Sequence, residues 1–323
     1  MEDKIKKFPR QLTEGYKLAD TAGLEYKDAK IKNIILAGMG GSGLVGNVTE
    51  VLSEVLDINI PVITHKNYNL PREASSNSLI VTISYSGNTE ETLSAYTEAT
   101  KLGAHLVVIT TGGKLAKMAK DDKNPGVIVP DGVQPRMAIG YQLSALLGVL
   151  SNAGIINSQK EKLENLSKNL NTGKYRDKAK ILADQIHGTV PVIYSSEKLG
   201  KIAYILKILI NETAKQHAFS NIFPEMNHNE LEGFENENRN NISVVMLKDL
   251  NDHKKIKKRM DVASKLIKER GYPVYTIDTD DKDWYNKSFS LILFGNWLAY
   301  YLSSKNNVES EAVDLIEEFK GLL

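Results

Sequence analysis

The feature that most constrains the fold of this 323-residue chain is an alternation of short apolar runs with longer helical patterns. The runs are rich in β-branched residues and are shorter than an ordinary helix. In the first half of the chain they occupy residues 34–37, 61–64, 79–83, 106–109 and 126–129. Continuous apolar runs that alternate with helices are typical of parallel strands covered on both faces. The first half is therefore predicted to form an α/β domain.

The second half repeats this scheme after a polar helical region at 158–186, which is expected to join the halves. In the first half, helices are predicted at 4–22, 42–56, 90–102 and 137–153, with a short one before residue 126. In the second half, strands are predicted at 190–194, 242–247 and 274–277, and helices at 198–215, 252–270, 284–303 and 310–322. The stretch between residues 215 and 242 is expected to be irregular.

Two tandem α/β domains follow from this pattern, each a parallel β-sheet flanked by helices on both faces. The first is expected at 1–153, with the opening helix, and the second at 154–323, with the linker helices and the C-terminal helix. A chain of this length can bury a core in each of two such domains.

Composition narrows the class of protein further. The 41 Lys and Arg nearly balance the 40 Asp and Glu, which gives no reason to expect nucleic acid or a membrane as partner. The absence of cysteine excludes disulfides, thiolate metal sites and cysteine nucleophiles. No apolar run follows the N-terminal charges, and the apolar stretch 289–302 is too short to span a bilayer. The basic run 253–259 lacks interleaved aromatics and is interpreted as a solvated helix face. A soluble, cytoplasmic protein is expected.

A glycine-rich turn follows the first predicted strand, with the sequence Gly-Met-Gly-Gly-Ser-Gly at 38–43. Glycines expose backbone N–H groups, and a helix N-terminus attracts anions, so Gly41 and Ser42 are candidates for binding a phosphate. The spacing fits a dinucleotide fingerprint poorly, and the second strand ends in Thr-His-Lys at 64–66 without the expected acidic residue. The Walker lysine is also absent. An ordinary glycine-rich turn is the alternative.

A hydroxyl-rich loop follows the strand at 79–83, with the sequence Ser-Tyr-Ser-Gly-Asn-Thr-Glu-Glu-Thr at 84–92. Ser84, Ser86 and Thr89 stand at a strand's carboxyl end, where open α/β sheets bind ligands, so a phosphate monoester is expected here. The alternative is a helix cap formed by Asn88 or Thr89, and this is expected to be partly true. A cap alone leaves Ser84 and Ser86 unexplained.

The two motifs together resemble the sugar isomerase (SIS) domain. More narrowly, the chain resembles the bifunctional phosphoglucose/phosphomannose isomerase family of archaea and some bacteria, which has two SIS domains in tandem. The resemblance extends over nearly the whole chain. It implies that Ser42, Ser84, Ser86 and Thr89 hold the phosphate of a sugar phosphate.

Two further segments supply candidates for the chemistry, since isomerisation needs a base and a cation beside the enediolate. Arg136 precedes an apolar helix and is similar to the family's Pro-Arg segment, whose arginine lies in the active site; a surface charge is the alternative. Glu212 lies in an apolar helix, where burial raises the pKa of a carboxyl group. Its segment resembles the family's Asn-Glu helix, which supplies the catalytic base, whereas a partner for Lys215 on a solvated face is the alternative.

His228 and Lys320 are carried over from the same resemblance. The segment around His228 is close to the family's Asn-His-Asn-Glu motif, whose histidine opens the pyranose ring and is thought to come from the partner subunit. This implies a homodimer with a shared active site. Metal binding by His228 with Glu225, Glu230 and Glu232 is the competing idea, but the spacing is not a helical zinc motif. Lys320 matches a terminal lysine that reaches the active site, and a solvated lysine is the alternative.

The expected activity is therefore the interconversion of glucose 6-phosphate, and of mannose 6-phosphate, with fructose 6-phosphate through a cis-enediol. It would need neither a cofactor nor a metal. Two other classes remain open. One is another SIS-type isomerase, although the amidotransferase form carries a cysteine domain and the arabinose 5-phosphate form usually carries CBS domains. The other is a non-catalytic sugar-phosphate sensor, which normally has an N-terminal helix-turn-helix.

Overall fold

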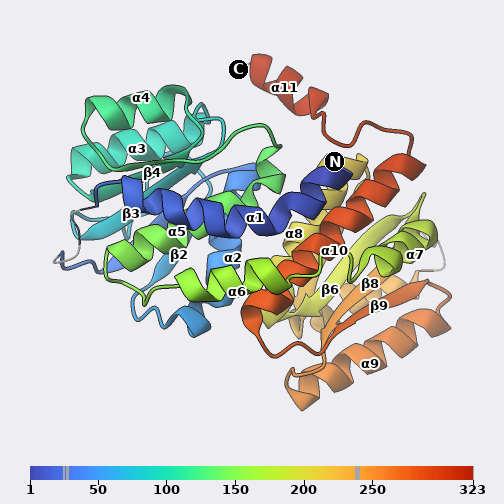
Figure 1. Cartoon of the computed structure of the whole chain (residues 1–323). Helices are drawn as coiled ribbons and strands as arrows, with labels where there is room; N and C mark the ends of the chain where they lie inside the picture. The colour runs from blue at the N-terminus through green and yellow to red at the C-terminus, as the bar shows by residue number, and fades with distance from the viewer. Residues whose placement is uncertain (25, 27–28, 237–240, 323) are drawn as a thin grey trace. The chain divides into compact units, whose positions relative to one another are not determined.

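The chain forms two compact units, the N-terminal unit Lys6–Leu170 and the C-terminal unit Met1–Ile5 with Asn171–Leu323 (Figure 1). The computed structural model describes residues 1–24, 26, 29–236 and 241–322. The predicted division at 153/154 falls earlier than the division by contacts. The residues between the two points belong to the N-terminal unit because their helix buries Leu163 and Leu166, and Ser167 Oγ donates to the main-chain oxygen of Pro9 over 2.7 Å.

The N-terminal unit contains a five-stranded parallel sheet in the order β2-β1-β3-β4-β5. The strands lie close to the predicted runs, at β1 Asn33–Ala37, β2 Val62–His65, β3 Ser78–Ser84, β4 His105–Thr110 and β5 Gly126–Ile128. All seven residues of β3 are buried, as expected for the centre of a sheet that is covered on both faces.

Helices cover both faces of this sheet. The helices of this unit are α1 Glu2–Leu18, from its residue Lys6 on, α2 Gly40–Leu56, α3 Glu90–Leu102, α4 Gly113–Asp121, α5 Ile139–Asn152 and α6 Lys160–Asn169, with the 3₁₀ turns η1 Ala19–Thr21 and η2 Pro135–Met137. On one face α3 and α4 lie over the strands (Figure 1). There Tyr96 and Leu115 belong to one buried cluster with Ile35, Ile80 and Leu106. On the other face α2 contacts β1 and β3, and α5 contacts α2 and β4. The predicted two-sided covering is confirmed.

The C-terminal unit contains a four-stranded parallel sheet in the order β7-β6-β8-β9. Its strands are β6 Val190–Ser196, β7 Phe219–Phe223, β8 Ile242–Asp249 and β9 Val274–Thr279. Its helices are α7 Arg176–Ile186, α8 Glu197–Ala214, α9 Lys254–Glu269, α10 Trp284–Lys305 and α11 Asp314–Gly321, with the 3₁₀ turns η3 Glu225–His228 and η4 Glu230–Glu235. Helix α9 lies on one face of the sheet and α8 and α10 on the other (Figure 1).

Strand β7 corrects the prediction of an irregular stretch after residue 215. It pairs in parallel with β6 at the edge of the sheet, with Phe219 opposite Val192 and Phe223 opposite Ser196. The sequence Phe-Ser-Asn-Ile-Phe has no continuous apolar run, because an edge strand is buried on fewer sides than a central one. Sequence patterning alone therefore does not detect it.

The basic run lies on α9, which begins after the N-cap residue His253. Most of its charged side chains are exposed, while Met260, Ala263 and Ile267 are buried against the sheet. Among the described residues, no helix combines the length and the apolar character that crossing a membrane would require.

Candidate active site

The two motifs of the N-terminal unit meet at one edge of its sheet. Because β1 and β3 are neighbouring parallel strands, the turn after Ala37 and the loop after Ser84 both start at the carboxyl edge. The turn leads into α2 and the loop leads into α3. Both helix N-termini therefore begin at this edge, where their unpaired N–H groups and partial positive charge favour an anion.

Ser42 connects the two motifs. It lies in the first turn of α2, two residues inside the helix start, and its side chain is 5% exposed. The N–H of Tyr85 donates to Ser42 Oγ over 3.0 Å, and Gln142 Nε2 donates to the same oxygen over 2.9 Å. The glycine-rich turn, the hydroxyl-rich loop and α5 are thus joined through a single hydroxyl.

The other hydroxyls of the loop are also ordered by hydrogen bonds. Ser84 Oγ lies 2.9 Å from Thr89 Oγ1 and accepts the N–H of Gly87 over 3.1 Å. Thr89 occupies the N-cap position of α3, but its side chain makes no capping bond there. The interpretation of Thr89 as a helix cap is therefore correct for its backbone position, but its hydroxyl does not cap the helix. Ser86 is exposed, and its Oγ accepts the N–H of Asn88 over 3.3 Å. Below, Ser42, Ser84, Ser86 and Thr89 are called the hydroxyl cluster.

Arg136 lies beside the glycine-rich turn. A β-carbon on Gly41 would stand 2.4 Å from the main-chain nitrogen of Arg136 and 2.5 Å from the carbonyl carbon of Pro135, so η2 packs directly on the backbone of the turn. Gln11 Nε2 on α1 donates to the main-chain oxygen of Met137 over 3.0 Å, which adds a second contact that fixes η2. Arg136 itself is 1% exposed, which rules out the alternative of a surface charge.

The side chain of Tyr85 connects the hydroxyl-rich loop to the segment 130–133. Its ring is buried, its hydroxyl donates to the main-chain oxygen of Pro130 over 2.9 Å, and the N–H of Val133 donates to that hydroxyl over 3.4 Å. Burial is the main cause that raises the pKa of Tyr85 above its ordinary value, so this side chain stays a neutral donor. A rigid support of this kind keeps the hydroxyl cluster in position.

Glu212 lies on the last turn of α8 in the C-terminal unit and is partly buried. Its neighbours Leu209, Ile210 and Thr213 are fully buried. The ammonium group of Lys215 donates to the main-chain oxygens of Glu212 over 3.1 Å and of Ala312 over 2.6 Å. Lys215 therefore ties the end of α8 to the segment before α11.

His228 is exposed at the end of η3. The next residue, Asn229, caps η4 by accepting the N–H of Glu230, and its Nδ2 donates to Glu225 Oε1 over 2.8 Å. The hydroxyl of Tyr194 donates to Glu230 Oε2 over 2.7 Å, and Asn221 donates to the other carboxylate oxygen. Two acidic residues of the segment thus hold its shape. Across the described ranges no cluster of three or more His, Asp or Glu is placed to hold a metal ion.

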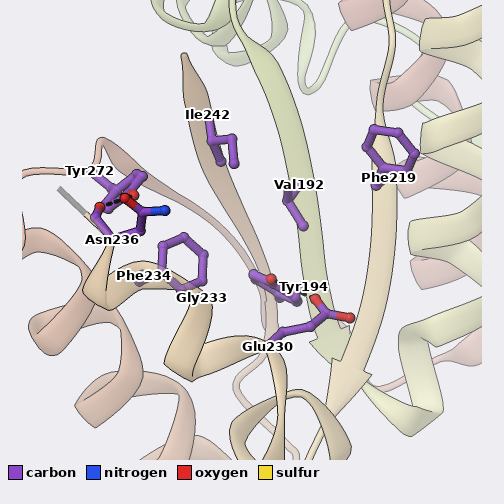
Figure 2. A pocket seen from close by; sticks show the side chains of 9 residues that line it. All are labelled: Val192, Tyr194, Phe219, Glu230, Gly233, Phe234, Asn236, Ile242 and Tyr272. Carbon is purple, nitrogen blue, oxygen red and sulfur yellow. Dashed lines mark hydrogen bonds between the residues drawn. The ribbon is translucent and has the colours of Figure 1, made fainter. Parts of the chain in front are cut away.

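A cavity of about 350 Å³ lies next to this segment (Figure 2). Figure 2 shows Glu230 and Tyr194 pointing toward each other at one end of the cavity, while Phe219 stands at the β7 side. Burial is the first cause and the bond to Glu230 the second by which the pKa of Tyr194 is raised above its ordinary value. The lining is otherwise largely apolar, from Val192, Phe234, Ile242 and Tyr272.

Lys320 lies on α11, a helix that buries none of its described residues. Its ammonium group pairs with Glu317 Oε1 over 2.7 Å, one turn earlier on the same helix, and its side chain is 60% exposed. This contact is what a solvated helical pair produces.

The structure thus brings Gly41, the hydroxyl cluster and the Arg136 segment together within the N-terminal unit, while Glu212, His228 and Lys320 stand on three elements of the C-terminal unit. Sequence reasoning missed two supporting residues, Tyr85 and Gln142. Gln142 carries a signal in the sequence, because it is a polar residue inside the apolar stretch 139–150. A buried amide in such a stretch needs a hydrogen-bond partner, and here the partner is Ser42.

Comparison with known proteins identifies the family of both domains. Residues 29–147 match the SIS domain, and residues 175–323 match the bacterial phospho-glucose isomerase C-terminal SIS domain. A hypothetical protein from Thermus thermophilus has the same fold, with a TM-score of 0.77, 17% identity and coverage of 98% of this chain and 88% of that chain. The fold and the strand-end site together define a tandem SIS protein.

Curated relatives narrow the class. The chain is 34% identical to a bifunctional phosphoglucose/phosphomannose isomerase of Caldicellulosiruptor bescii, over 100% of this chain and 98% of the relative. It is also 30% identical to a D-glucosamine-6-phosphate 4-epimerase of Sulfolobus acidocaldarius, over 90% of this chain and 88% of that protein. The chain belongs to the bifunctional phosphoglucose/phosphomannose isomerase family.

Proposed function

We propose that this chain interconverts glucose 6-phosphate and mannose 6-phosphate with fructose 6-phosphate by proton transfer through a cis-enediol. The observation that carries the proposal is the junction at Ser42, which joins two strand-end loops rich in hydroxyls and N–H groups within a SIS domain. Neutral donors at helix N-termini suit a phosphate monoester. The family relationship supports the sugar substrate.

The hydroxyl cluster and the backbone of Gly41 hold the phosphate in this proposal. The glycine at position 41 supports this arrangement because it lets the backbone of η2, with Arg136, pack directly on the turn. Arg136 steadies the enediolate. Its burial supports this role, because a guanidinium in a site of low dielectric acts more strongly on a developing oxyanion than one in water.

Glu212 is the proposed base that moves the proton between C2 and C1. Its place among buried apolar neighbours near the end of α8 supports this role. His228 opens and closes the pyranose ring, and its exposure supports delivery to a partner's site in a homodimer. Lys320 assists ring opening. Glucose and mannose phosphates give the same enediol, so one base serves both if the bound sugar rotates about its C2–C3 bond. We place this activity in the cytoplasm, without cofactor or metal.

The decisive experiment is a coupled assay of the full chain with glucose 6-phosphate, mannose 6-phosphate and fructose 6-phosphate in the presence of a chelator. Glu212→Gln is expected to lower kcat by roughly 10²–10⁴-fold, the usual contribution of a general base. Glu197→Gln, an exposed glutamate on the first turn of the same helix, is the matched control and is expected to keep the wild-type rate. A Glu212→Gln variant with wild-type kcat would remove Glu212 from the mechanism.

Two further arms of the assay separate the rival classes. Glucosamine 6-phosphate is added because a relative at 30% identity is named a 4-epimerase of that sugar. Its epimerisation without isomerisation of the hexose phosphates would replace the proposed activity. Tight binding of fructose 6-phosphate without any turnover would instead indicate a sensor.

A further inference from the structure

Ser42 is held by two hydrogen bonds in which its oxygen is the acceptor. Tyr85 N–H donates to Oγ over 3.0 Å and Gln142 Nε2 donates over 2.9 Å. A serine hydroxyl has one proton and two lone pairs, so both lone pairs are used. The hydroxyl proton is then the hydrogen-bonding function that Ser42 can still offer to a ligand.

The neighbouring pair Ser84 and Thr89 also has a hydroxyl proton left to donate to a ligand. Their two oxygens lie 2.9 Å apart, so one of their two hydroxyl protons is shared between them. Ser84 Oγ also accepts the N–H of Gly87 over 3.1 Å. One proton of the pair therefore remains for a ligand, whichever residue provides it. The cluster presents donors to the site.

At Ser42, the orientation of the Gln142 side chain determines whether the hydroxyl can donate to a ligand. Its side chain is 0% exposed on α5, and its Oε1 is buried and accepts no hydrogen bond within the described part of the chain. If the carbonyl oxygen of this amide faced Ser42 in place of the nitrogen, it would accept the hydroxyl proton and leave Ser42 with no donor for a ligand. The orientation of one buried amide thus decides whether Ser42 donates.

We propose that Gln142 is a positioning residue that holds Ser42 as an obligate donor and so makes the site select the dianion of a phosphate monoester over its monoanion. A dianion only accepts hydrogen bonds, whereas the P–OH of a monoanion also needs an acceptor. The inference rests on the proposed function, in which the hydroxyl cluster holds the substrate's phosphate.

The test is a calorimetric titration of the full chain with inorganic phosphate and with sulfate between about pH 5 and pH 8, where phosphate loses its second proton. Sulfate stays dianionic over this range and corrects for changes in the protein. The wild-type ratio of phosphate to sulfate affinity is expected to rise at least about tenfold across the range. In Gln142→Met the Ser42 hydroxyl turns freely and accepts as well as donates, so this rise is expected to shrink about threefold or more.

Gln159→Met is the matched control. Gln159 is also a buried amide of the N-terminal unit, and its Nε2 donates to the main-chain oxygen of Asn157 over 2.7 Å, away from Ser42. Its loss is expected to lower thermal stability without changing the phosphate-to-sulfate ratio. Ser42→Ala decides the question if Gln142→Met does not fold, because it removes the donor itself and is expected to reduce the rise in the same way.

A folded Gln142→Met variant that keeps the full wild-type rise would overturn the inference, as would a Ser42→Ala variant that does so. A wild-type chain that binds neither anion would also overturn it, whatever its turnover. A wild-type chain that shows the rise but isomerises no hexose phosphate would contradict the proposed function and leave the inference standing, since the titration involves no turnover.

Discussion

Gly41 sits where the glycine-rich turn presses against η2. A β-carbon there would approach the main-chain nitrogen of Arg136 to 2.4 Å, closer than real β-carbons come to other atoms. The contacts are with backbone atoms, which cannot turn aside as a flexible side chain can. A side chain at Gly41 would therefore push η2, and Arg136 with it, away from the hydroxyl cluster.

Gly41→Ala is expected to destabilise the protein by about 1–3 kcal/mol, as overpacking usually does, and to raise KM for the sugar phosphate. Urea unfolding and steady-state kinetics measure the two effects. Gly126→Ala in β5 is the matched control, because an added β-carbon there meets no atom within 4 Å. If the two variants had the same unfolding free energy and the same KM, the turn at Gly41 would have to shift at no cost, which would contradict this prediction.

Asp249 and Lys287 form a buried ion pair, with side chains 3% and 2% exposed. The ammonium group of Lys287 also lies 4.1 Å from the centre of the Trp284 ring. Asp249 Oδ1 accepts the N–H of Asn251 over 2.9 Å, a bond that asparagine could keep. Replacing Asp249 by asparagine therefore removes the charge and little else.

Asp249→Asn is expected to cost about 3–5 kcal/mol of unfolding free energy, because it leaves the Lys287 ammonium buried without a counter-charge. The double variant Asp249→Asn with Lys287→Met should recover most of this loss, since both charges are then gone. Urea unfolding of the wild type, the single variant and the double variant measures both changes in unfolding free energy. A double variant as unstable as the single one would mean that shape, and not charge, sets the cost.

At the scale of elements, the η3–η4 segment is fastened to the sheet at Glu230. The carboxylate of Glu230 accepts a hydrogen bond from Tyr194 on β6 (Figure 2) and another from Asn221 on β7. Glu230 lies two residues after His228 in the chain. Short 3₁₀ turns have few hydrogen bonds of their own, so such anchors set their orientation. Strand β7 matters here because it supplies one of the two anchors.

Glu230→Ala and Tyr194→Phe are each expected to lower kcat about tenfold, by loosening His228, and the double variant should be no slower than the slower single one. The non-additivity follows because both changes remove the same hydrogen bond. Tyr275→Phe is the control, since its hydroxyl donates to Gln185 on the same unit. Additive losses in kcat would show that Glu230 and Tyr194 act independently.

At the scale of the whole molecule, the two units repeat one topology but not one site. The order β7-β6-β8-β9 corresponds to β2-β1-β3-β4, so Asp249 at the end of β8 takes the place of Ser84 at the end of β3. The Asp249 carboxylate is paired with Lys287 and has no proton to donate to an anion, whereas the hydroxyl of a serine can donate one. The phosphate is therefore expected to bind to the N-terminal unit alone.

A homodimer with a shared active site makes a prediction for mixed subunits. Glu212→Gln and His228→Ala chains, each inactive alone, are unfolded together and refolded as a mixture. If His228 acts in the partner's site, mixed dimers regain one intact site each, or about a quarter of wild-type activity at equal amounts. Light scattering checks that dimers form. A mixture without activity would place Glu212 and His228 of one chain in the same site.

The sequence by itself determined the elements whose residues carry periodic apolar patterns. Eight strands and the long helices follow from runs such as 79–83, because burial on both faces demands apolar side chains wherever it occurs. The place of the hydroxyl-rich loop 84–92 was also predictable. It follows a predicted parallel strand, and the carboxyl ends of neighbouring parallel strands lie at the same edge of a sheet.

Only the tertiary structure decided what depends on contacts between distant residues. The burial of Arg136 beside Gly41 and the bond from Gln142 to Ser42 leave no periodic trace, because each involves one or two residues and a partner far along the chain. The pairing of β7 with β6 leaves none because an edge strand lacks a continuous apolar run. Hydrogen bonds and close contacts select single atoms, whereas hydrophobic burial selects whole faces. The fold can therefore be derived from patterning, but the donors and acceptors of the site are decided by how the elements pack.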